Sequence, residues 1–200
     1  MDYNEAINSV EVSFMAARNA SWTKAATVIA LILQASFIIA AFVFFVLIVH
    51  VIINPDTVSG KPVSIYFYGV SFSVNDVAAY TVGGKVSISG VVLYLLYGCA
   101  QAIISAAAFN RIYAVLEYSK TRPPFRWENV EKLRKAGFLF LSTVLLQFLL
   151  ALLGMIFVRD VITFAVNIKL DNAIIGVIVL CVAQIFAQGV QMQEEQDGLV

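Results

Sequence analysis

The chain has 200 residues, of which 60% are hydrophobic and only 13% are charged, and its formal net charge is zero. Soluble domains are about half apolar and about a quarter charged, so this composition excludes an ordinary soluble domain. A chain of this length forms a single domain, and we expect no direct contact with nucleic acid.

Four uninterrupted apolar runs are long enough to cross a bilayer. A transmembrane helix needs about 20 apolar residues to cross roughly 30 Å of hydrocarbon. Continuous runs also differ from the alternating segments of a membrane β-barrel. We therefore predict an all-α membrane protein, with residues 25–190 forming a four-transmembrane-helix bundle. The helices are expected at about residues 25–53, 88–109, 136–158 and 172–190.

Residues 1–24 precede the first apolar run and have a pattern of their own. Tyr3, Ile7, Val10 and Phe14 recur at heptad spacing, and Trp22 follows at the expected headgroup level. This pattern predicts an amphipathic N-terminal helix on the inner membrane surface. A helix that packs under the bundle or against another subunit fits equally well. We expect the run that follows to be a retained anchor, because it is longer than a signal-peptide core.

The loops on the other side of the membrane are rich in β-branched and aromatic residues. Residues 63–74 predict a small extracytoplasmic β-hairpin, and residues 163–170 are a third extended candidate. Because a lone hairpin is marginal in water, the two segments could join into a three-stranded sheet that caps the bundle.

The distribution of Lys and Arg predicts the orientation. With both termini and the second loop inside, nine cationic residues lie inside, two in the N-terminal tail and seven in the loop, and four lie outside. Cytoplasmic loops are enriched in Lys and Arg. We therefore predict a multi-pass protein of the bacterial inner membrane with cytoplasmic N- and C-termini and a cytoplasmic acidic tail at residues 191–200.

Each predicted membrane helix contains a glutamine: Gln34, Gln101, Gln147 and Gln184. Polar side chains avoid lipid, so these four predict an intramembrane polar layer. The layer would either line the path of a small solute or join helices by hydrogen bonds, and the second interpretation is favoured.

Small residues recur every four positions in the second helix, at Gly98, Ala102 and Ala106. Such a stripe allows another helix to approach closely. The sequence leaves open whether that neighbour belongs to the same chain or to a homodimer.

Nothing in the sequence indicates catalysis, a metal or a cofactor. His50 is the single histidine, and the two cysteines lie in apolar runs. Metal and acid–base sites need several such groups at defined spacing. We expect the protein not to be an enzyme.

The second loop is the richest segment in charged and aromatic residues. Pro123 and Pro124 should end the preceding helix, and a new one should begin near Trp127. A basic, aromatic loop either satisfies anionic lipid headgroups or docks a cytosolic partner. The candidate partner-binding residues, including the acidic tail, are Phe125, Arg126, Trp127, Glu128, Asn129, Arg134, Lys135, Glu194, Glu195 and Asp197.

Two segments resemble a known family. Residues 124–135, PFRWENVEKLRK, resemble the P-F-x-x-E-N-V-x-x-L-R motif of the bacterial membrane family called domain of unknown function 2975. Residues 185–197 resemble its second signature, an apolar helix running into G-x-x-L-Q-x-E-x-D. The likeness spans most of the chain beyond residue 24, although Arg126 replaces the usual Ser or Thr cap and Met192 the usual leucine.

The resemblance implies a membrane protein that holds or modulates a small helix-turn-helix transcription regulator, because members are often encoded beside such regulators. Three functions remain open: a regulatory protein that binds a cytosolic partner, a small-solute transporter or channel, and a structural subunit of a membrane complex.

Overall fold

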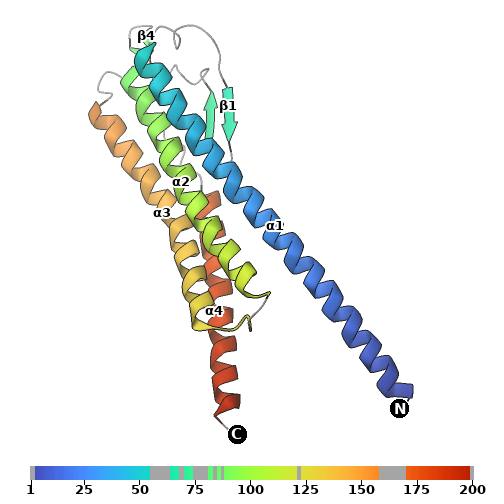
Figure 1. The fold of residues 1–200 in the computed structure, drawn as a ribbon. Coiled ribbons are helices and arrows are strands. Elements are labelled where there is room, and N and C mark those ends of the chain that lie inside the picture. The colour runs from blue at the N-terminus through green and yellow to red at the C-terminus, as the bar shows by residue number, and fades with distance from the viewer. Residues whose placement is uncertain are drawn as a thin grey trace.

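In the part of the chain that the computed structural model describes, four long helices pack in chain order (Figure 1). The backbone is described for residues 3–54, 64–67, 70–73, 81–82, 85–86, 88–120, 123–157 and 170–198. Side chains are described for residues 21–54, 88–120, 123–150, 152–153, 156, 170–196 and 198.

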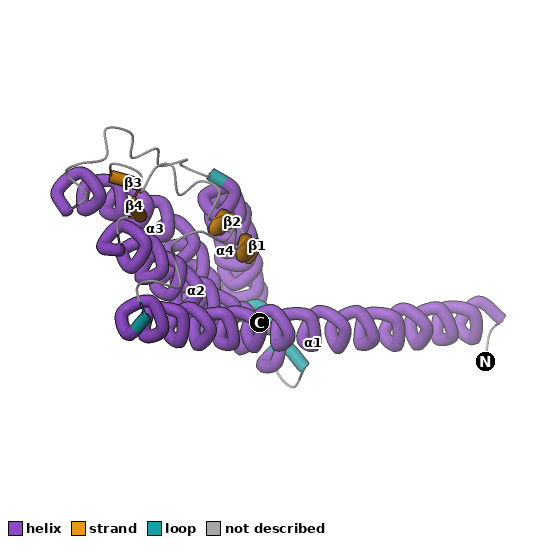
Figure 2. The backbone as a smooth tube through the Cα atoms, turned by 90° about the horizontal axis from the view of Figure 1, so that it is seen from above, coloured by secondary structure: helices purple, strands orange, loops and turns teal. Residues whose placement is uncertain are grey.

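Helix α1, Tyr3–Ile53, has 51 residues and is therefore about 75 Å long. That is more than twice the thickness of a hydrocarbon core. Seen from above, its N-terminal part extends well beyond the other three helices (Figure 2). No Pro or Gly lies between residues 3 and 53, and the helix ends just before Pro55. The predicted N-terminal segment is thus the beginning of α1 and not a separate helix.

The other three helices are α2 (Ile88–Tyr118), α3 (Trp127–Phe157) and α4 (Asp171–Asp197). The start of α3 at Trp127 confirms the helix start expected after the proline pair. Within the described residues, four stretches are long and apolar enough to cross a membrane: Ser21–Ile53, Ile88–Tyr118, Trp127–Leu150 and Asp171–Gln196. The protein is therefore a multi-pass membrane protein. Both chain ends lie at the same end of the bundle (Figure 1).

The predicted fold class is wrong in its β part. The described residues contain two separate, short antiparallel pairs, in which β1 (Ser64–Phe67) pairs with β2 (Val70–Ser73) and β3 (Thr81–Val82) pairs with β4 (Lys85–Val86). The described strands form no three-stranded sheet that caps the bundle, and the bundle itself is all-helical. Residues 163–169, the expected third strand, lie outside the described residues. β-Branched and aromatic residues favour extended backbone but do not select a pairing partner.

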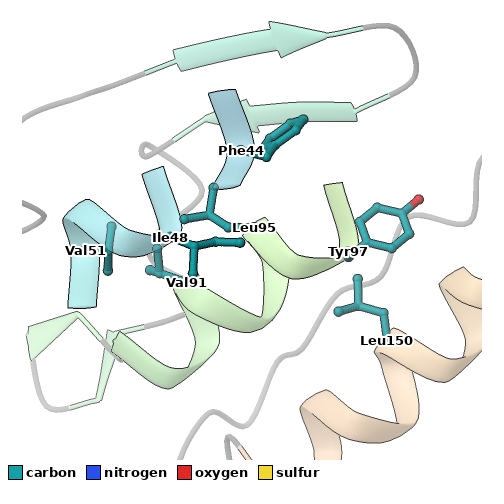
Figure 3. Close-up of a cluster of buried hydrophobic side chains, with 7 residues drawn as sticks. All are labelled: Phe44, Ile48, Val51, Val91, Leu95, Tyr97 and Leu150. Carbon is teal, nitrogen blue, oxygen red and sulfur yellow. The ribbon is translucent and has the colours of Figure 1, made fainter. Parts of the chain in front are cut away.

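The helices are joined by buried apolar clusters that follow the bundle axis. One cluster joins Phe44, Ile48 and Val51 of α1 to Val91, Leu95 and Tyr97 of α2 and to Leu150 of α3 (Figure 3). Farther along, Phe37 of α1 stacks on Phe109 of α2, with ring centroids 5.5 Å apart. Phe109 in turn forms a T-shaped pair with Phe140 of α3, with ring centroids also 5.5 Å apart. Contacts between aromatic rings therefore connect α1, α2 and α3.

Candidate functional site at the meeting of the second loop and the C-terminal tail

The start of α3 is fixed by a buried asparagine. The Asn129 side-chain amide donates a hydrogen bond to the Pro124 carbonyl, 2.9 Å away, and Asn129 is only 3% exposed. The backbone N–H groups of Asn129 and Val130 both donate to the Arg126 carbonyl. Asn129 thus fixes the conformation of the loop from a buried position, where a partner cannot reach its side chain.

The end of α4 packs directly against this loop. The Trp127 indole N–H donates to a carboxylate oxygen of Glu194, 3.0 Å away. The rings of Phe125 and Phe186 lie 5.4 Å apart. Phe125 also covers Gly189, where a Cβ atom would come within 2.5 Å of its ring. The two segments that carry the family motifs therefore meet in space.

Beneath these contacts, α3 and α4 are tightly packed. Val130, which is 1% exposed, forms a buried cluster with Ala187 and Val190. Leu133 joins a second cluster with Val115 of α2 and Ala183 of α4. The loop and the tail therefore rest on a closely packed base formed by three helices.

The surface formed there combines aromatic and charged side chains, and we call it the loop–tail face. Phe125 is 40% and Trp127 45% exposed. Its other exposed members include Arg126, Glu128, Glu131, Arg134, Lys135, Glu194 and Glu195. The side chain of Asp197 lies outside the described ones, so its place in the face stays a prediction.

Two interactions position lysines near this face. The Lys135 ammonium lies 2.6 Å from a Glu131 carboxylate oxygen, with both side chains more than half exposed. The Lys132 ammonium lies over the Tyr118 ring, 3.7 Å from its centroid. Exposed ion pairs contribute little to stability, so the first of these mainly sets the charge pattern.

The four predicted glutamines do not share one environment. Gln101 and Gln147 are each 3% exposed, Gln34 is half-buried, and Gln184 is exposed. The Gln147 amide and the Tyr97 hydroxyl are hydrogen-bonding partners between α3 and α2. In the described structure, Oε1 of Gln101 is buried without a hydrogen-bond partner. The structure thus places two of the four residues deep between helices and one on the outer surface of α4.

The small-residue stripe of α2 packs against α1 of the same chain. A Cβ at Gly98 would lie 2.8 Å from the Phe44 ring. Ala102 and Ala106 form a buried cluster with Phe37 and Ala40 of α1. This contact answers the question left open by the sequence, because the stripe is already occupied within the chain.

Sequence reasoning missed the roles of Phe186 and Gly189 and the pairing of Gly137 with Gly176. Gly137 of α3 and Gly176 of α4 face each other, and a Cβ on either would lie 3.0 Å from the carbonyl oxygen of the other. Within apolar runs, such residues look like ordinary core positions. The one available signal was that Phe186 and Gly189 fall inside the second motif.

Among the side chains that the structure describes, no group of three or more His, Cys, Asp or Glu residues could hold a metal ion.

The comparison with family models matches residues 71–200, well over half of the chain, to the family described as protein of unknown function (DUF2975). The chain belongs to this family. The match confirms the family resemblance over a shorter stretch than expected, because α1 and β1 lie outside it. No curated protein matches the chain. No solved structure matches it either.

Proposed function

We propose that this DUF2975 protein is a non-enzymatic regulatory protein whose loop–tail face binds a cytosolic protein. The observation that carries the proposal is the meeting of the two motif segments, through the Trp127–Glu194 hydrogen bond and the packing of Phe125 on Phe186. The family resemblance implies the class of partner, a small helix-turn-helix transcription regulator.

The composition of the face supports protein binding. Protein interfaces are enriched in aromatic residues and Arg, and their energetic centres are often Trp, Tyr or Arg surrounded by less important contacts. Here Trp127 and Phe125 are both more than a third exposed and share the face with the exposed Arg126 and Arg134. The face carries both the tail carboxylates Glu194 and Glu195 and the loop cations, and this mixed charge pattern favours a specific orientation of the partner.

The distribution of cations supports a cytoplasmic location for the face. Seven of the thirteen Lys and Arg residues lie between residues 111 and 135, around the turn between α2 and α3. Cytoplasmic segments near membrane helices carry such an excess. In a bacterial inner membrane, the face would then point to the compartment that contains transcription regulators.

The test is an affinity pull-down of the full chain from native membranes in mild detergent, with bound proteins identified by mass spectrometry. We expect the wild-type chain to recover a small DNA-binding protein in stoichiometric amount. The variant Arg126→Glu/Arg134→Glu should lose it, because both side chains are exposed and reversal opposes the charge of the partner.

The matched control is Lys24→Glu, which reverses an exposed cation at the start of the apolar part of α1, away from the face. It should bind as the wild type does. Undiminished binding by the double variant would contradict the proposal, as would recovery of the chain alone from membranes that contain the candidate regulator.

A further inference from the structure

The outer surface of α4 is the least covered of the four spans. In its most apolar window only 22% of the residues are buried, compared with 44% for α2. The buried side of α4 faces α3, where Ala183, Ala187 and Val190 lie in the core. The opposite side of the helix is therefore left to lipid or to another protein.

This outer surface has a regular pattern. Ile174, Val177, Cys181, Gln184 and Gln188 follow one another at alternating intervals of three and four residues, and all five are exposed. Heptad spacing places side chains on one seam of a helix, as in coiled coils. We call these five residues the α4 stripe.

The part of the α4 stripe that contains Gln184 is poorly suited to contact with lipid. Gln184 lies about 20 Å along α4 from Asp171, well within a span of roughly 30 Å. A primary amide that faces hydrocarbon without hydrogen bonds costs several kcal/mol. Gln101 and Gln147, in contrast, lie buried between helices of the bundle. The outward position of Gln184 therefore calls for a polar partner outside this chain.

The glutamine side chains of the α4 stripe indicate the kind of partner that it contacts. An amide side chain both donates and accepts hydrogen bonds, so glutamine is complementary to another glutamine. When both copies insert with the same orientation, the two-fold axis of a symmetric dimer is parallel to the membrane normal. Each residue on the seam then meets its own copy at the same depth. We propose that two copies of this chain pair through the α4 stripe, with Gln184 and Gln188 hydrogen-bonded to the same residues of the second copy.

Cys181 provides a direct test, because it lies one turn from Gln184 on the same stripe. The variant Cys99→Ala retains Cys181 as the single cysteine. Full-length chains in membrane vesicles would be oxidised with copper phenanthroline and separated without reductant. A disulfide forms only when the Cα atoms are within about 7 Å, so we expect a band at twice the chain mass of 21.9 kDa.

The matched control moves the cysteine around the helix. In Cys99→Ala/Cys181→Ala/Val182→Cys, the thiol replaces a side chain that is 38% exposed but lies off the stripe. It should give little dimer. Absence of the dimer with Cys181, equal cross-linking from position 182, or attachment of Cys181 only to a different protein would each overturn the proposal.

A second measurement tests the amides. Energy transfer between differently labelled copies in lipid vesicles should show dimerisation weakened about tenfold in Gln184→Leu/Gln188→Leu, since interhelical amide bonds contribute modestly in membranes. The control Ile178→Leu/Ile185→Leu changes two exposed apolar residues beside the stripe and should pair as the wild type does. Unchanged pairing of the glutamine variant would show that the amides do not hold the dimer.

Discussion

The contact between α1 and α2 and the contact between α3 and α4 both depend on glycine, but in different ways. At Gly98 the space normally taken by a side chain is filled by the ring of Phe44 from α1. At Gly137 and Gly176 the two helix backbones approach each other directly, and a Cβ at Gly176 would also lie 3.2 Å from the Leu141 amide nitrogen.

The difference matters because lipid removes the hydrophobic force between helices. Membrane helices associate through close packing and hydrogen bonds. A ring can rotate away from an added methyl group, whereas two backbones can only move apart together with their helices. The α3–α4 contact is therefore expected to be the rigid one. It also supports the loop–tail face, because that face needs the start of α3 and the end of α4 in register.

The largest effect is expected from Gly176→Ala. The new methyl group meets the Gly137 carbonyl oxygen and the Leu141 backbone, neither of which can yield without separating the helices. We expect a loss of about 2–3 kcal/mol in unfolding free energy, typical of overpacking. Denaturant unfolding in detergent micelles, followed by circular dichroism, would measure it. A loss below that of Gly98→Ala would contradict the ranking of the two contacts.

A smaller effect is expected from Gly98→Ala. The three atoms nearest to the methyl group all belong to the Phe44 ring, at 2.8–3.2 Å. Because this ring is 3% exposed, its displacement still disturbs a packed cluster, and we expect a loss of about 1 kcal/mol. The same unfolding measurement on Gly98→Ala/Phe44→Leu should recover most of this loss. Failure of the smaller side chain to restore stability would show that the α1 and α2 backbones limit the contact.

Gly189→Ala should change binding more than stability. The added methyl group would push away the Phe125 ring, which is 40% exposed and therefore contributes little to the core. We expect at most about 0.5 kcal/mol of destabilisation, as for most surface changes. Recovery of the cytosolic partner in the pull-down should nevertheless fall several-fold. Normal recovery would exclude Phe125 from the binding surface.

The smallest effect on folding is expected from Trp127→Phe, which removes the indole donor to Glu194. An exposed hydrogen bond of this kind contributes about 0.5 kcal/mol or less. Glu194→Gln retains an acceptor oxygen and is the matched control, with no measurable change expected. If the control is as destabilised as Trp127→Phe, charge in the tail matters more than the hydrogen bond.

The sequence was sufficient to predict the four helices, since each depends on a long apolar run, and the start of α3, since two prolines precede it. The unbroken course of α1 was predictable in principle from the absence of Pro and Gly before residue 54. The arrangement of the β segments was not predictable, because their composition indicates a local preference for extended backbone and does not specify a pairing partner.

The candidate site was predicted in part. Aromatic and charged residues drew attention to the loop and the tail, and the structure brings Trp127 and Glu194 together. The role of Asn129 could not be foreseen, because a polar residue in a basic loop looks exposed in the sequence, whereas here it satisfies the Pro124 carbonyl. The prediction of one polar layer rested only on the expected depth of the four glutamines in the membrane. Depth does not indicate which side of a helix faces the neighbouring helices.

The central claim is that the loop–tail face binds a cytosolic protein. A photo-reactive phenylalanine analogue placed at position 127 in the full chain, in native membranes, would test it most directly, with the same analogue at Phe138 as control. Both side chains are exposed on α3, at 45% and 62%. The account predicts that light attaches a small cytosolic protein at position 127 and not at position 138. Attachment of lipid alone at position 127, or of the same protein at both positions, would contradict it.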